Sequence, residues 1–458
     1  MSIKQGTLGF SSTLKTFFDH VWCMLIYKLS IELAECQEKD RNWIFCMKSS
    51  ISLIHRQESW ISRLKCHIFL IAILLVGLIC SILINILSTP FFKLYTGELF
   101  PTYGDITDFD MWFGFAASIK YAILNNGAGF NSFLFTSVHA FTPLFPGTLS
   151  IFDLIFNNMV VSAIILNGVF NVGTLFVLRK IVIEFYHLEG KDALIILIIY
   201  QSNFVICMDS ALMNVTMPAV ALCITLAFYT NTKLAETPNF ENGMKVFLTN
   251  TLVVFCREII WPFLMVGPIL VVIKDFEKIN GAKHRISSFL RREFKTLYFS
   301  IALPLICYLE YFLLVDAFPS IFRQLDTLSG DNLFRTVPTF LLNAFIAFNV
   351  MPFLILFNIK GIFKKKENFP LIIWTGIFFI IRFLIPGPLW AHYWEPVIFC
   401  ISILCFQSLQ KIQCETKKNR IVSVIVSLNL ALLFFAVIFP RVLFAIYFYP
   451  FGPSVLVN

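Results

Sequence analysis

Hydrophobic residues occur along this chain in repeated continuous stretches, separated by short polar segments. The stretches run to roughly 17 to 25 residues, the length at which an α-helix crosses about 30 Å of hydrocarbon. Lys and Arg gather in alternate polar segments, which is typical of loops that face the cytosol. The pattern predicts an all-α polytopic membrane protein with about 11 transmembrane helices.

The polar segments also predict where the crossings lie. The first clear span is His67 to Ile86, preceded by basic residues, so the N-terminus is expected in the cytosol. We interpret residues 1–66 as a cytosolic region with interfacial amphipathic helices, and residues 67–458 as one multi-span domain. The other expected spans are 151–178, 193–208, 215–230, two half-spans within 245–272, 296–315, 338–357, 369–385, 394–409 and 421–441.

Composition agrees with this reading. Hydrophobic residues make up 58% of the chain and charged residues 14%, whereas soluble proteins usually carry about 25% charged residues. The net charge of +8 follows from the basic loops and therefore reports topology, so nucleic acid is not expected as a partner. None of the 12 Cys residues forms a close C-x-x-C pair, which indicates neither a metal site nor a disulfide framework.

The most unusual stretch is the first expected luminal loop, at about 90–150. It carries the acidic residues Asp105, Asp108 and Asp110, and a short luminal helix is expected over 110–124. Asp110 is a candidate general base, because a carboxylate at this place can accept the proton of a substrate hydroxyl. The alternative is that Asp108 or Asp110 only caps this helix.

Further residues are candidates for substrate binding. Asp108 forms a D-x-D pattern with Asp110, and Trp112 follows them closely. Arg257 lies beside Glu258 at the centre of an apolar stretch, where ionisable groups are costly. It could contact a phosphate or simply pair with its neighbour. Arg382 could contact a lipid phosphate or anchor its helix at the interface, and His392 belongs to a Trp-rich luminal segment typical of an interfacial belt.

The loop resembles that of the PIG-V family, GPI mannosyltransferase 2. The matching stretches are Phe109-Asp110, the Gly- and Asn-rich 125–129, and Ala140 to Pro146 with its PLFP ending. By order of elements, the segment at Asp209-Ser210 and Arg257 also correspond. Phe109 stands where the family has Trp, and Arg257 is followed by a different sequence from the family's.

This resemblance implies a GT-C glycosyltransferase of the endoplasmic reticulum membrane. It implies transfer of mannose from dolichol-phosphate-mannose, through an α1,6 link, as the second mannose of a GPI-anchor precursor. Asp110 would be the base, and Arg257 or Arg382 would contact phosphate. No metal or other cofactor is implied. The expected partners are the two lipid substrates, the bilayer and a small membrane partner subunit.

Three alternatives stay open. The first is a GT-C transferase that uses another acceptor. The second is a membrane transporter, suggested by Arg257 and Glu258 at membrane depth. The third is a non-catalytic partner subunit of a GPI enzyme complex.

Overall fold

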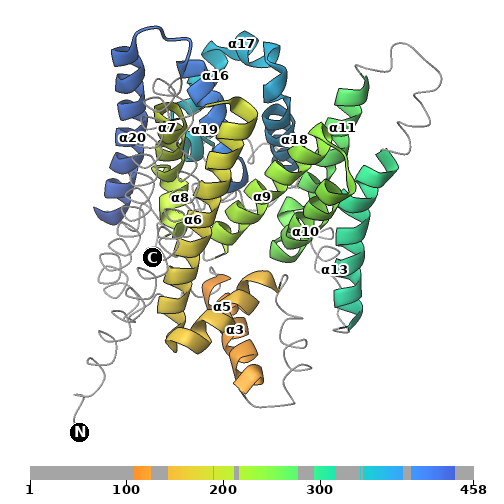
Figure 1. The fold of residues 1–458 in the computed structure, drawn as a ribbon. Coiled ribbons are helices and arrows are strands. Elements are labelled where there is room, and N and C mark those ends of the chain that lie inside the picture. The colour runs from red at the N-terminus through yellow and green to blue at the C-terminus, as the bar shows by residue number, and fades with distance from the viewer. Residues whose placement is uncertain are drawn as a thin grey trace, which may run out of the picture. The chain divides into compact units, whose positions relative to one another are not determined.

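The computed structural model describes residues 108–124, 143–188, 190–210, 216–276, 293–314, 341, 344–384 and 394–438. Within these ranges the chain is helical and contains no strand (Figure 1). The all-α prediction is therefore confirmed for the described part of the chain. Residues 1–66, the expected span at 67–86 and His392 lie outside it.

The principal helices follow one another with short connections. Their bounds are α3 Asp108–Leu124, α5 Leu144–Phe156, α6 Met159–Tyr186, α7 Lys191–Gln201, α8 Phe204–Ser210, α9 Met217–Glu236, α10 Phe240–Cys256, η3 Glu258–Met265, α11 Val266–Phe276, η4 Tyr298–Ala302, α13 Leu303–Leu314, α16 Met351–Phe357, α17 Ile359–Lys364, η5 Lys366–Asn368, α18 Phe369–Leu384, α19 Glu395–Leu409 and α20 Glu415–Ile438. η3 and η5 are 3₁₀ helices and η4 is a π-helix.

Helix α9 lies at the centre of the helical bundle. It packs against α6, α10, α11 and α19, and α19 in turn packs against α7, α16 and α18. Aromatic rings fill the space between α9, α18 and α19: Phe228 meets Trp374 at 5.4 Å and Phe399 at 5.2 Å between ring centroids. Phe263 of η3 stacks on Trp374 at 4.3 Å. Such offset and edge-to-face pairs add to the packing of a core.

A buried polar seam joins α9 and α10 to η4. The Asn231 amide donates to Asn250 Oδ1 at 3.0 Å, and the Asn250 amide donates to the carbonyl of Ser300 at 2.8 Å. Gly267 of α11 comes so close that a Cβ there would collide with the Asn231 side chain. Small residues and side-chain amides at helix contacts are typical of bundles that lack a strong hydrophobic drive between helices.

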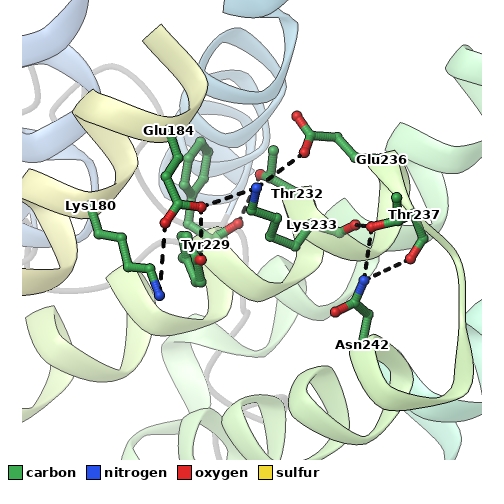
Figure 2. A network of polar contacts seen from close by, with 9 residues as sticks. Lys180, Glu184, Tyr229, Thr232, Lys233, Glu236, Thr237 and Asn242 are labelled. Carbon is green, nitrogen blue, oxygen red and sulfur yellow. Dashed lines mark hydrogen bonds and ion pairs between the residues drawn. The ribbon is translucent and has the colours of Figure 1, made fainter. Parts of the chain in front are cut away.

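A second polar network links α6 to α9 (Figure 2). Glu184 accepts a hydrogen bond from Tyr229 at 3.0 Å and lies 3.0 Å from the ammonium of Lys233. Lys180 is 3.8 Å from the same carboxylate, and Lys233 is also 3.5 Å from Glu236. The network fastens the ends of two helices that are far apart in the sequence.

Three predicted spans are not single continuous helices, because each is broken at or beside an Asn residue. The span 151–178 is broken at Asn157, which has φ 47° and ends α5, while the Asn158 side chain caps the start of α6. The span 193–208 is divided into α7 and α8 at Asn203, whose side chain donates to a backbone carbonyl at position 347 (2.7 Å). The span 338–357 is interrupted at Asn349, with φ 53°. Asn adopts the left-handed conformation more readily than most residues.

Other predictions agree with the structure. The expected helices at 369–385 and 394–409 are α18 and α19, within one residue at each end. The helix in the acidic loop is α3. A helical break at Arg257 was expected from the two half-spans, and Arg257 indeed has extended backbone between α10 and η3. α20 begins six residues before the predicted span 421–441.

One described helix, Met159–Tyr186, is long and apolar enough to cross a membrane by length and composition. Leu144–Phe156, Phe263–Ile273 and Glu395–Leu409 are shorter apolar helices. The number of crossings stays a prediction.

Candidate active site

The candidate site is built on α3, which packs along α5 (Figure 1). Trp112 is only 2% exposed, and its ring meets Phe145 edge-on at 6.3 Å. Ala116 on α3 and Leu149 on α5 are also buried. Residues four apart lie on one face of a helix, so each helix presents a continuous apolar stripe. Phe145 belongs to the PLFP run, and the structure therefore joins the two ends of the acidic loop.

A buried ion pair continues this contact. Lys120 Nζ donates to Asp153 Oδ2 at 2.8 Å, to the Asp153 carbonyl at 3.2 Å and to Asn157 Oδ1 at 2.8 Å. Ser162 Oγ of α6 donates to the other Asp153 oxygen at 3.4 Å. An ammonium has three hydrogens, so all its donors are used. Lys120 thus fastens α3 to the corner between α5 and α6.

The contacts fix the relative direction of the two helices. Trp112 precedes Lys120 by eight residues, and their partners Phe145 and Asp153 are also eight apart. Because the order is the same, α3 and α5 run in the same general direction through their contact. The first turn of α5 therefore lies against the end of α3 that carries Asp110.

Asp108 and Asp110 occupy the first turn of α3, as expected for a helix that begins in the acidic loop. Their side chains lie outside what the structure describes, so both the catalytic and the capping interpretations stay predictions. Trp112 is enclosed by Phe115 and Phe145. Its described contacts are those of a packing residue, and its role in substrate binding stays a prediction.

Arg257 is half-buried at the junction of α10 and η3. Its guanidinium donates to Thr216 Oγ1 at 2.9 Å and lies 3.4 Å from the Met217 sulfur. Both partners belong to the start of α9. The extended backbone of Arg257 is what turns the side chain toward α9 rather than along its own helix.

Arg382 lies near the C-terminal end of α18, and its side chain is not described. His392 lies outside the described residues. The neighbouring Trp394, in contrast, is fully buried against Phe348, Phe378 and Phe379. The interfacial-belt interpretation is therefore wrong for Trp394, because a belt residue needs contact with the membrane surface.

The structure also reveals a buried acidic pair that the sequence reading treated as two separate features. Asp209 at the end of α8 is 0% exposed and Glu395 at the start of α19 is 1% exposed, and the two carboxyl groups lie close enough to influence each other electrostatically. The buried Tyr200 phenol lies within electrostatic range of both. The sequence reading placed Asp209 in a luminal turn and Glu395 in a luminal aromatic cluster, and the structure buries both side chains.

Two buried carboxyl groups cannot both carry charge cheaply, and such pairs share a proton or hold a cation. Within the described residues no group of three or more His, Cys, Asp or Glu side chains is arranged to hold a metal ion. The sequence signal that was available is the presence of two acids next to apolar helix ends. Nothing in the sequence indicated that they meet.

No family model, no curated protein and no solved structure matches this chain.

Proposed function

We propose that this protein is a multi-span membrane mannosyltransferase of GT-C type that acts in the lumen of the endoplasmic reticulum. Its donor would be dolichol-phosphate-mannose and its acceptor a GPI-anchor precursor, to which it adds the second mannose through an α1,6 link. The observation that carries the proposal is the packing of α3, the helix of Asp110, on the PLFP helix α5 through Trp112 and Phe145.

A membrane environment is supported by how polar and apolar side chains are distributed. Several helices expose large hydrophobic side chains, while Asn167, Asn231, Asn250 and Asn429 are fully buried. A soluble protein rarely exposes apolar side chains on most of its helices. The exposed hydrophobics include Ile151, Ile155, Val169, Phe176, Leu248, Leu252, Phe353, Leu356 and Phe357.

The proposed reaction is a single displacement. Asp110 accepts the proton of the acceptor hydroxyl while that oxygen bonds to the anomeric carbon of mannose. The bond from this carbon to the donor phosphate oxygen breaks, and the lipid phosphate leaves as an anion. The leaving group needs little acid assistance but gains from nearby positive charge.

Two sources of positive charge fit this step. The N-terminal turns of α3 and α5 lie at the same end of their contact, and helix N-termini favour anions. The guanidinium groups of Arg257 and Arg382 are the proposed direct contacts to phosphate. Asp108, Trp112 and His392 complete the proposed substrate site, which uses no metal.

A transporter is the second candidate, and the buried pair of Asp209 and Glu395 favours it. Ionisable residues inside a membrane bundle often belong to proton or ion pathways. A transporter would depend on these acids and on Arg257, and would keep its activity when Asp110 is changed.

The test is rescue of cells that lack GPI mannosyltransferase 2, with surface GPI-anchored proteins measured by flow cytometry. The wild-type chain is compared with Asp110→Asn, with Glu241→Gln as a matched control. Glu241 is an exposed carboxylate of α10, paired only with Lys245 among the described residues. All variants are compared at matched expression and localisation.

We expect rescue by wild type and Glu241→Gln, and at least a 100-fold lower mannosyl transfer in microsomes for Asp110→Asn, as for removal of a general base. Rescue by Asp110→Asn would remove this residue from the mechanism. Failure of a correctly localised wild type, also when co-expressed with the partner subunit of its own species, would exclude the GPI acceptor.

A further inference from the structure

Lys120 is a half-buried cation whose ammonium makes three hydrogen bonds to the corner between α5 and α6. It lies ten residues after Asp110 on the same helix, so it cannot itself take part in chemistry at the helix N-terminus. At about 1.5 Å per residue the two positions are about 15 Å apart along α3. Its environment therefore needs another explanation.

The apolar stripe of α3 alone would leave the helix free to rotate or slide. Trp112 contacts Phe145, and Ala116 and Ile119 are fully buried, but apolar contacts are not directional. The Lys120 contacts are directional, because each of the three donors meets an acceptor fixed by the α5–α6 corner. Asn157 is held in the left-handed conformation that ends α5, and Asp153 precedes it by one turn.

The ion pair is also shielded. The Lys120 side chain is 18% exposed and that of Asp153 is 6% exposed. Removing one partner from such a pair leaves a buried charge without its counter-charge, which costs much more than losing a surface pair. The geometry is thus both directional and costly to disturb.

We infer that Lys120 is a positioning residue, which fixes the rotation and register of α3 on α5 and thereby sets the place of Asp110. The inference rests on the proposed function only for the role of Asp110, since the rotation and register of α3 on α5 can be measured without any activity. Trp112 and Lys120 act as two attachment points, eight residues apart, and Asp110 lies just beyond the first of them.

How closely α3 packs on α5 can be measured from the accessibility of a thiol placed in their contact. Ala116 lies between the two attachment points and is 0% exposed, and a small buried thiol behaves much as a small apolar residue. The full chain carrying Ala116→Cys is treated with maleimide in membranes. Labelling is quantified peptide by peptide, because the chain has 12 other cysteines.

Four backgrounds are compared: wild type, Lys120→Met, Lys120→Arg and Lys245→Met. Methionine keeps the length of the side chain but removes its charge and donors. Lys245 pairs with Glu241 on an exposed face of α10, with side chains 55% and 75% exposed, and serves as the matched lysine control. Lys120→Arg is added because an arginine can keep the contact with Asp153.

We expect labelling at position 116 to be at least five times faster in Lys120→Met, and unchanged in Lys245→Met and Lys120→Arg. Equal labelling in wild type and Lys120→Met would overturn the inference, whatever reaction the enzyme catalyses. The labelling experiment needs no substrate, so its result can be interpreted even if the proposed function is wrong.

The second readout is mannosyl transfer in microsomes, normalised to folded protein. We expect kcat to fall at least tenfold in Lys120→Met with the KM for donor within about twofold, and Lys120→Arg to recover most of the loss. Faster labelling with an unchanged kcat would overturn the positioning of Asp110. A wild-type chain without transfer activity would refute the proposed function. The role of Lys120 in the packing of α3 would then be tested by the labelling result alone.

Discussion

Two of the networks that fasten helices in this protein are ionic, and they differ mainly in exposure. In the first, Lys120 and Asp153 are 18% and 6% exposed, and Lys120 uses all three of its donors. In the second, Glu184, Lys233 and Lys180 are 31%, 30% and 56% exposed, and the two lysines share one carboxylate (Figure 2). In the first network the donors of Lys120 have fixed partners, whereas in the second network the lysines can exchange one partner for another.

The second network also uses ring faces. Lys180 lies over the Tyr229 ring at 4.7 Å from its centroid, and Lys233 over the Phe185 ring at 5.0 Å. Cation–π contacts of this kind contribute about 0.5–1 kcal/mol at exposed sites. Losing one partner therefore leaves each cation with another favourable contact. The comparison teaches that the number of contacts in a network is a poor guide to how much the free energy of unfolding falls when the network is removed.

The largest effect is expected when the buried pair is broken on one side. Asp153→Leu should lower the free energy of unfolding by about 3 kcal/mol, because Lys120 then remains buried without its counter-charge. Thermal unfolding of the purified chain in detergent measures this loss. The double variant Lys120→Met with Asp153→Leu should recover more than half of it, since an apolar pair replaces an ionic one. A double variant as unstable as the sum of the single variants would show that the pair is not coupled.

A smaller effect is expected at Glu184. Glu184→Gln removes the ion pairs with Lys180 and Lys233 but keeps an oxygen that can accept from Tyr229. The loss should be about 1 kcal/mol in the same unfolding experiment, and salt should reduce it because the network is solvent-accessible. A salt-independent loss as large as that of Asp153→Leu would erase the proposed difference between the two networks.

The smallest effect is expected for the exposed pair of Lys191 and Glu415, which are 2.6 Å apart. The hydrogen bond from Lys191 lowers the pKa of the Glu415 carboxyl. Its contribution is therefore present above the ordinary pKa of a glutamate and is lost as the pH falls through the lowered value. Glu415→Gln should change stability at neutral pH less than Glu184→Gln, and the two chains should converge in acid. A difference that grew as the pH fell would contradict this sign.

Much of the helical pattern followed from the sequence. α18 and α19 are continuous apolar runs between polar segments, and each contains a Pro near its start, so their bounds could be predicted. The helix break at Arg257 also followed, because basic residues on both flanks led us to expect two half-spans here. These are local properties of composition and charge.

The divided spans did not follow, because an Asn inside an apolar run costs little by propensity. At Asn157 and Asn349 the break is a single residue in the left-handed conformation, and at Asn203 it is accompanied by a tertiary contact, in which the side-chain amide donates to a carbonyl 144 positions further on. The buried acids Asp209 and Glu395 were missed because they come from two distant helix ends, and only the packing of the bundle brings them together.

The α3–α5 contact stands between these cases. The spacing of Trp112, Ala116 and Lys120 repeats in Phe145, Leu149 and Asp153, so a matching stripe was present in the sequence. Four-residue spacing predicts a shared face on each helix. It does not predict which two faces meet. Only the structure shows that these faces of α3 and α5 pack together.

The 3₁₀ helix after Arg257 increases the length that the chain gains per residue. A 3₁₀ helix rises about 2.0 Å per residue against about 1.5 Å for an α-helix. The eight residues of η3 and the eleven of α11 can together reach about 33 Å at those rises. A stretch that looks too short when counted as an α-helix can thus be as long as a bilayer core is thick.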